Sequence, residues 1–294
     1  MRSTKNLGTV ASRMVRLLGL LSVALLATAQ APALAADGAS RAAEPAIGER
    51  AALVRDMLMG SVQLVADRAG GARRTGSAVI LAVDAETDRT LLLTAAHVLS
   101  PLVEQELRAL TALQREAGAV TVLAVDDAVD LALVEVEGLA ATGIQLEPVT
   151  MVPHAMLGDD ILVVSFPWGR RATLVSGMVS QIVWDETIRS SELPLGGSVA
   201  LIDASVSHGM SGGGVFHRAS GALVGIVRGY RSVRVTLPGE ETPAVTLPVA
   251  GETTVVPTMT ILCFLQANGR SQQMAFPLQP VLQRLDCAAL DRPS

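Results

Sequence analysis

The sequence predicts an all-β protein built from two antiparallel β-barrels. Short apolar runs rich in Val, Ile, Leu and Ala alternate with turn residues over positions 61–137 and again over 160–230. The second set shows no helical period, and a parallel sheet would need helices between its strands. Only 2% of the residues are aromatic. We therefore expect a core made of aliphatic side chains.

The first barrel is expected over residues 59–150. Its strand-like runs are separated by turn residues and read SVQLVAD, GSAVILAVD, RTLLLTAAH, AVTVLAV and LALVEVE. A helix is expected after the third run, because Ser100 and Pro101 are typical of a helix start and Gly118 would end it. The apolar residues between these limits share one helical face: Val103, Leu107, Leu110 and Leu113.

The second barrel is expected over residues 151–290, since the alternation is lost over 138–159. Its runs read DILVVSFP, ATLVSGMVSQIVWD, SVALIDAS, GVFHR and GALVGIVRGY. VTLP occurs twice within residues 232–257, and proline is excluded from central strands, so this part is expected to form an exposed hairpin or loop. TMTILCFLQ is expected to be a strand, and AFPLQPVLQRL a last strand that leads into a C-terminal helix.

Three short motifs contain residue types that suit nucleophilic catalysis. GMSGG places Ser211 among glycines that permit a sharp turn, LLLTAAHV contains His97, and DDAVDLALVEV contains Asp130. GMSGG also fits the G-x-S-x-G turn of α/β-hydrolases, whose order is Ser, then acid, then His. Only His217 follows the serine, with no room for an acid between them. The order His, Asp, Ser is instead that of the chymotrypsin geometry.

Together, TAAHV, DLALVEV and DASVSHGMSGG resemble trypsin-like serine proteases. FPWGRRATLVSGMVSQI is similar to the same region of the bacterial Deg/HtrA-like branch. The resemblance covers about residues 60–285 and implies two six-stranded barrels of the chymotrypsin type, with a short helix after the catalytic His and a C-terminal helix. About 65 residues follow Gly229 and are expected to finish the barrel, so no PDZ domain is expected. The implied triad is His97, Asp130 and Ser211.

The same resemblance implies that the N–H groups of Gly209 and Ser211 form the oxyanion hole, and that no cofactor is needed. No metal site is expected, since the four histidines and two cysteines lack ligand spacing.

The resemblance also places the substrate pocket at Ser205 and Val206, with Gly229 and Arg231 on the opposite wall. None of these is a carboxylate, so cleavage after Lys or Arg is not expected. Cleavage after small or medium aliphatic residues is expected instead. An inward-turned Arg231 would favour acidic residues.

Residues 1–35 read as an export signal. A basic segment without acids precedes an apolar stretch at 17–29, and Ala33-Leu34-Ala35 offers an A-x-A cleavage site. The apolar stretch is too short to span a bilayer, although an uncleaved membrane anchor is the alternative. Residues 36–58 would form the mature N-terminal segment, of which 37–50 is expected to be mobile. The expected location is the periplasm or the extracellular space.

Loss of the leader, which carries four basic residues and no acid, changes the formal net charge from −5 to about −9. This net negative charge argues against nucleic acid or acidic lipid as partners and leaves a polypeptide substrate. In an oxidising compartment Cys263 and Cys287 are candidates for a disulfide, but Cys263 lies in an apolar run and could simply be buried.

The predicted function is that of an exported serine endopeptidase acting on unfolded or exposed polypeptide segments. Three alternatives remain open at this level. The triad could serve an esterase, the fold could be a non-catalytic binding module, or the enzyme could be latent until a partner opens its site.

Overall fold

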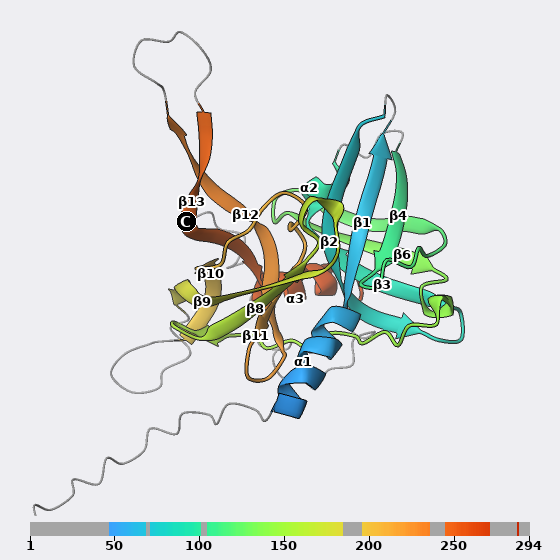
Figure 1. Cartoon of the computed structure of the whole chain (residues 1–294), viewed down its shortest axis with the longest axis horizontal. Coiled ribbons are helices and arrows are strands. Elements are labelled where there is room, and N and C mark those ends of the chain that lie inside the picture. The colour runs from blue at the N-terminus through green and yellow to red at the C-terminus, as the bar shows by residue number, and fades with distance from the viewer. Residues whose placement is uncertain are drawn as a thin grey trace, which may run out of the picture. The chain divides into compact units, whose positions relative to one another are not determined.

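The structure is a computed structural model, and it describes residues 47–68, 71–100, 105–184, 196–235, 245–270 and Cys287. Two antiparallel sheets make up most of this part of the chain (Figure 1). The predicted export signal and the predicted last strand with its C-terminal helix lie outside the described residues. Within those ranges, no helix combines the length and apolar character needed to cross a membrane.

The first sheet has six strands in the order β4-β1-β2-β3-β6-β5. All neighbouring pairs are antiparallel. Ala109 of β4 accepts a backbone hydrogen bond from Ala117 just before β5, which brings the two edges of the sheet together. The strands are β1 (Ser61–Arg68), β2 (Arg73–Asp84), β3 (Arg89–Thr94), β4 (Gln105–Thr111), β5 (Val120–Asp126) and β6 (Leu131–Glu137).

The second sheet has the order β13-β12-β11-β8-β9-β10-β7, and β13 also pairs with β10. That additional pairing joins six of the strands in a ring. The strands are β7 (Ala155–Met156), β8 (Asp160–Ser165), β9 (Thr173–Trp184), β10 (Gly196–Ile202), β11 (Gly214–His217), β12 (Leu223–Val235) and β13 (Val245–Pro257). The predicted all-β class with two antiparallel barrels is confirmed.

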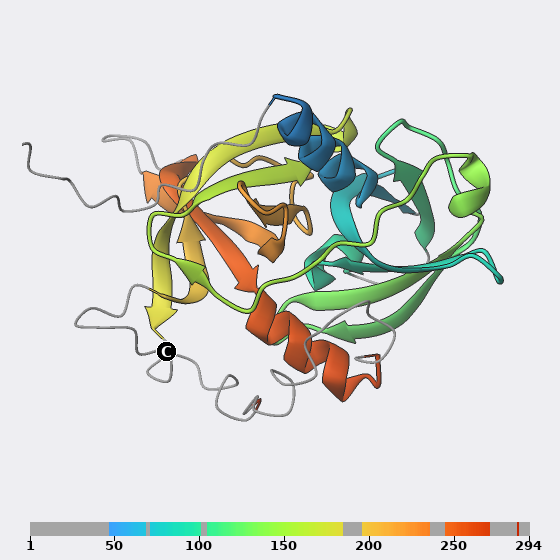
Figure 2. The ribbon, with the colours of Figure 1, turned by 90° about the horizontal axis from the view of Figure 1, so that it is seen from below.

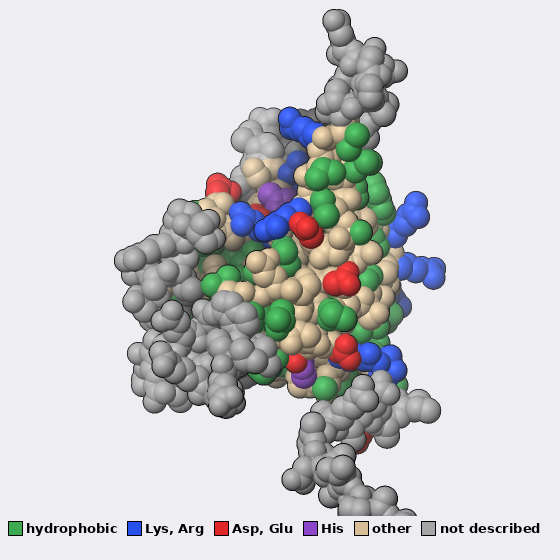
Figure 3. Space-filling model, turned by 90° about the vertical axis from the view of Figure 1, so that its left-hand side faces the viewer, with side chains coloured by type: hydrophobic (Ala, Val, Ile, Leu, Met, Phe, Trp, Pro, Cys, Tyr) green, Lys and Arg blue, Asp and Glu red, His purple; other side chains and the backbone are tan. Residues whose placement is uncertain are grey.

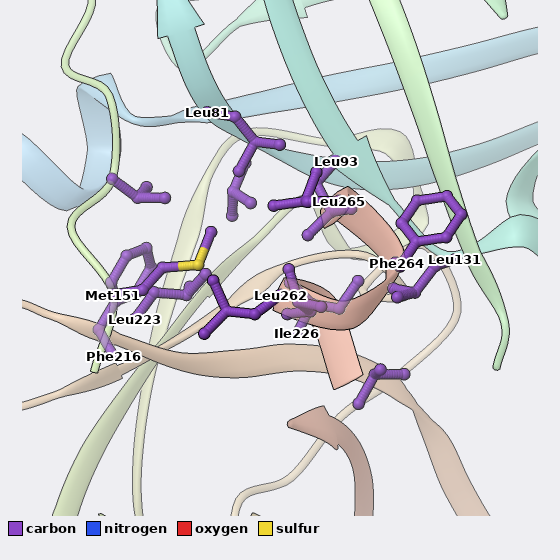
Figure 4. Packing of buried hydrophobic residues seen from close by; sticks show 14 of the residues in the cluster. Leu81, Leu93, Leu131, Met151, Phe216, Leu223, Ile226, Leu262, Phe264 and Leu265 are labelled. Carbon is purple, nitrogen blue, oxygen red and sulfur yellow. The ribbon is translucent and has the colours of Figure 1, made fainter. Parts of the chain in front are cut away.

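Aliphatic side chains fill each barrel and the junction between the barrels. Strand β2 shows how one strand serves both cores, because successive side chains point to opposite faces. Ala78 and Ile80 face the interior of the first barrel, whereas Val79 and Leu81 face the second barrel. In the junction, leucines of the first sheet meet Phe216, Leu223 and Ile226 of the second (Figure 4).

One helix replaces a strand that the sequence predicted. TMTILCFLQ forms α3 (Thr258–Ala267), so the expectation of a strand was wrong. A short apolar run is compatible with a buried strand or a buried helix, and here the helix buries Ile261, Leu262, Phe264 and Leu265 on one face in the junction (Figure 4). Figure 2 shows α3 and the N-terminal helix α1 (Ile47–Met59) on opposite sides of the region where the barrels meet.

Two further expectations for local structure were wrong. The helix predicted between Ser100 and Gly118 is absent from the described residues there, where β4 pairs with β1 over seven residue pairs. Sheet pairing outweighs the local helix signals. Residues 47–50, predicted to be mobile, belong to α1, which packs the buried Met57 and the partly buried Leu53 against the junction.

The VTLP segment forms the outer part of a hairpin, as the sequence predicted. Val233 pairs with Leu247, and Ser232 pairs with Pro248. This hairpin extends beyond the barrel (Figure 1) and exposes the apolar side chains of Val233, Val235 and Leu247.

The two cysteines are joined in the structure. Cys263 of α3 and Cys287 form a disulfide with a Cα–Cα distance of 5.6 Å. The bond connects α3 to a later part of the chain and lies beside the turn that contains Val129.

Candidate active site

Strand pairing brings His97 and Asp130 together. Thr94 at the end of β3 lies opposite Ala132 at the start of β6, so the residues just beyond these ends are neighbours. His97 stands in the four-residue helix α2 (Ala96–Leu99). Its Nδ1 lies 3.0 Å from both carboxylate oxygens of Asp130, and its backbone N–H donates to Oδ1 at 3.0 Å.

Asp130 has an unusual backbone conformation and is nearly buried. Its φ of 59° lies in the left-handed region, which Asp tolerates better than most residues, and the residue is 7% exposed. Burial alone would raise the pKa of the carboxyl. The hydrogen bonds from the ring and backbone of His97, together with the charges of His97 and Arg228, outweigh burial and hold the pKa of Asp130 below its ordinary value of 3.8.

Ser211 lies in the loop between β10 and β11, and this loop is fixed to the first barrel. The carbonyl of Ser211 accepts a hydrogen bond from the N–H of Ser77 at 2.8 Å. The buried hydroxyl of Ser77 donates to the carbonyl of Gly209 at 2.8 Å and accepts from the N–H of Phe166 at 2.9 Å. The sequence analysis did not identify Ser77. The available signal was that this serine lies on the same face of β2 as the apolar residues Val79 and Leu81.

The backbone at Gly209 is arranged to present its N–H group. The carbonyl of His208 accepts a hydrogen bond from the N–H of Trp168 at 2.7 Å, and in a trans peptide the next N–H points the opposite way. In the described ranges, neither Gly209 N–H nor Ser211 N–H donates to another backbone group. Gly209 has φ +87°, and a Cβ there would meet the Phe166 carbonyl oxygen at 2.7 Å. Glycine is therefore required at this corner.

His97 and Ser211 line one cleft of about 610 Å³. The Ser211 hydroxyl donates to the carbonyl of Arg228 at 3.3 Å, and no hydrogen bond to His97 is found among the described residues. Catalytic hydrogen bonds are often long or misaligned without substrate, so this geometry is compatible with a triad. The hydroxyl must rotate away from Arg228 before the imidazole can accept its proton.

The structure separates the predicted pocket residues into two groups. Val206 and Gly229 line the cleft. Ser205 is exposed and does not line it, and Arg231 instead pairs with Glu252 at 3.4 Å. Of the four predicted pocket residues, the structure thus brings Val206 and Gly229 to the cleft, and not Ser205 or Arg231.

Three ring side chains that sequence reasoning did not assign to the pocket form one wall of the cleft. Trp168 and His208 make an edge contact with ring centroids 4.9 Å apart, and His208 and Tyr230 make another at 6.4 Å. Trp168 is 61% exposed and has φ +56°, an unusual value for a bulky residue. Such strain is found at functional sites.

A second grouping of serine, histidine and aspartate occurs on the surface. His217 Nδ1 lies 3.0 Å from the Ser220 hydroxyl, and Nε2 lies 3.9 Å from Asp159. Two nearby N–H groups belong to the same turn: Gly221 donates to the carbonyl of His217, and Ala222 donates to the Ser220 hydroxyl. This grouping is a hydrogen-bonded turn, and none of its residues lines the cleft that contains Ser211.

Charged groups outside the cleft do not suggest another kind of site. Among the described residues, no three His, Cys, Asp or Glu side chains gather as metal ligands would. On the face shown in Figure 3, the arginines lie in small groups interspersed with acidic and apolar side chains.

Comparisons with known proteins identify the family and support the fold. The sequence model of the family described as "Trypsin-like peptidase domain" matches residues 76–226. An inactive serine-to-alanine mutant of Rv3671c from M. tuberculosis has a similar structure, with 19% identity and a TM-score of 0.51 over 75% of this chain and 91% of that one. A serine endoprotease from Yersinia pestis is also similar, with 19% identity and a TM-score of 0.53 over 78% of this chain and 68% of that one. No curated protein matches the chain.

Proposed function

Because the chain belongs to the trypsin-like peptidase domain family, we propose that it is an exported serine endopeptidase that cleaves exposed polypeptide through His97, Asp130 and Ser211. The observation that carries the proposal is the contact between the buried Asp130 carboxylate and the His97 ring at the edge of the cleft that contains Ser211. A binding module would not need this arrangement.

The geometry supports the following steps. The Ser211 hydroxyl rotates from the Arg228 carbonyl, attacks the peptide carbonyl, and transfers its proton to His97 Nε2. Asp130 keeps the other ring nitrogen, Nδ1, protonated and stabilises the imidazolium. The N–H groups of Gly209 and Ser211 bind the oxyanion, and each such donor lowers the barrier by about 3 kcal/mol. His97 then protonates the leaving amine, and water hydrolyses the acyl-enzyme in the reverse sequence of proton transfers.

Labelling by a fluorophosphonate probe tests the nucleophile. The probe is expected to attach to Ser211 of the mature protein, and Ser211→Ala should lose all labelling while its circular dichroism spectrum stays the same. Ser220→Ala is the matched control, since Ser220 also contacts a histidine but lies outside the cleft that contains Ser211. Labelling that survives in Ser211→Ala would show that the assigned nucleophile is wrong.

Export is supported by the sequence of residues 1–35 and can be tested on the same sample. Protein recovered from outside the cytoplasm of a bacterial host should have the intact mass of a chain beginning at Ala36. A mass that retains the leader would contradict cleavage at Ala33-Leu34-Ala35.

Cleavage after small or medium aliphatic residues is the expected specificity. Val206, Gly229 and Tyr230 line the cleft, and the described lining includes no carboxylate that could pair with Lys or Arg. The pairing of Arg231 with Glu252 argues against a preference for acidic residues. An apolar pocket discriminates by only ~1–3 kcal/mol per methylene, so several aliphatic residues should be accepted.

Digestion of an unfolded protein, with mass spectrometry of the new C-termini, measures this specificity. Val, Ala and Leu should dominate at the cleaved position. Cuts concentrated after Lys or Arg would refute the pocket assignment, and cuts after Asp or Glu would point to arginines of the cleft.

A latent enzyme is the second candidate, and one observation favours it. The Ser211 hydroxyl donates to the Arg228 carbonyl, and no hydrogen bond to His97 is found among the described residues. Labelling of the isolated protein that begins only after a peptide is added would support latency, whereas labelling without peptide would exclude it.

A further inference from the structure

Arg228 contacts two of the three proposed catalytic residues, Asp130 and Ser211. Its Nε lies 3.5 Å from Oδ2 of Asp130, and its carbonyl accepts the hydrogen bond from the Ser211 hydroxyl at 3.3 Å. The Asp130 side chain is 10% exposed and the Arg228 side chain 52%. A solvent-accessible cation is thus placed against a nearly buried catalytic carboxylate.

Strand β12 places Arg228 at this point. The backbone of Val227 exchanges two hydrogen bonds with the nucleophile loop, one with Gly212 and one with Gly213, each at 2.8 Å. Val227 is buried in the core of the second barrel. Arg228 follows at an irregularity in the pairing of β12 with β13, between Val227 and Gly229, and its side chain reaches Asp130.

We propose that Arg228 is a positioning residue that orients the Asp130 carboxylate. Through its charge, Arg228 also extends to lower pH the range in which the His97–Asp130 pair can accept a proton from Ser211. This inference rests on the proposed function. It concerns a residue whose side chain meets neither the reacting atoms nor the pocket lining.

The physical basis is competition between two cations for one carboxylate. Asp130 stabilises a proton on the imidazole by its negative charge, and the guanidinium neutralises part of that charge. Protonation of the pair therefore becomes harder, and a lower pH is needed to inactivate it. The charge of Arg228 also contributes to the lowered pKa of Asp130. The coupled pair titrates as a unit, so the effect belongs to the pair.

The other charged groups near the pair act from different positions. Arg74 of β2, which also lines the cleft, donates to the carbonyls of His97 and Ser100. Asp126, in the turn before Asp130, accepts from the N–H groups of Ala128 and Val129. Among the described residues, Arg228 is the arginine that forms an ion pair with the Asp130 carboxylate.

The test is the pH dependence of kcat/KM for a peptide substrate, measured on the mature chain. In Arg228→Met the acid-side midpoint is expected to rise by roughly 0.5–1 pH unit, while KM changes less than about twofold. Arg228→Lys keeps the charge and should restore the wild-type midpoint. Arg234→Met is the matched control, an exposed arginine further along the same strand, and should leave the profile unchanged. If Arg228→Met fails to fold, Arg228→Gln removes the charge in its place.

A second measurement separates this inference from the proposed function. The acid titration of the His97–Asp130 pair can be followed through the His97 ring protons by NMR in a Ser211→Ala background, which needs no activity. A midpoint that rises when Arg228 is replaced supports the inference even if no peptide is cleaved. An active wild-type enzyme whose profile and NMR titration are both unchanged in Arg228→Met would overturn the inference and leave the proposed function intact.

Discussion

Replacement of His97 with alanine is expected to lower kcat for peptide hydrolysis about 10⁶-fold, because the triad acts as a unit and the serine loses its proton acceptor. The fold should be retained, since nearly half of the His97 side chain is exposed. The measurement is kcat on a chromogenic peptide, with thermal unfolding as the check on folding. The remaining activity would come from the oxyanion hole and substrate binding.

His217→Ala provides the comparison for this experiment. His217 also contacts a serine and lies near an aspartate, but it does not line the cleft that contains Ser211. Its replacement should change kcat by less than about twofold. Equal losses in the two variants would mean that the cleft has been misassigned, and an active His97→Ala enzyme would mean that another base accepts the proton.

Replacement of Asp130 with asparagine is expected to lower kcat about 10⁴-fold. An amide NH₂ beside His97 Nδ1 favours the wrong tautomer, with the proton on Nε2, and the ring can then no longer accept a proton from Ser211. Asparagine is the appropriate substitution because it tolerates the left-handed backbone at this position, whereas alanine would add strain. Asp127→Asn, in the same turn but exposed, is the control and should keep full activity.

The same variant should alter how stability depends on pH. The pKa of Asp130 is lower in the folded protein than its ordinary value of 3.8, so the carboxylate stabilises the fold above about pH 4, and this contribution is lost as the pH falls through the folded value. Asp130→Asn lacks the contribution. The difference in unfolding free energy between the two proteins, measured by urea denaturation, should therefore be largest above about pH 5 and shrink in acid. A difference that grows in acid would contradict the direction of the shift.

Motifs in contiguous sequence were the most informative part of the chain. His97, Asp130 and Ser211 were selected from short motifs and their order, and the structure places His97 against Asp130 with Ser211 in the same cleft. Their catalytic roles stay predictions until the variants are measured. The pocket was harder to predict, because Ser205 was placed by its distance in sequence from Ser211 and Arg231 by alignment along a strand, and neither decides which side chains face the cleft.

Predictions from local sequence patterns were wrong where one pattern is compatible with both a helix and a strand. Residues 258–266 are a short apolar run that suits a strand or a helix, and packing in the junction between the barrels selects the helix α3. The segment after Ser100 shows apolar residues at helical spacing, yet Gln105–Thr111 is a strand. Pairing with β1 satisfies its backbone groups, and that partner lies about 40 residues away in the sequence.

By itself, the sequence determined the all-β class, the two antiparallel barrels and membership of the peptidase family, since these depend on periodicity and on short motifs. Only the tertiary structure decided which groups surround the candidate catalytic residues. The Ser77 hydroxyl that holds the nucleophile loop, the Trp168 N–H that orients the peptide at Gly209, and the Arg228 guanidinium beside Asp130 all act across the junction or between distant loops. Such contacts depend on how strands pair and twist, and the identity of a side chain alone does not specify its partner in space.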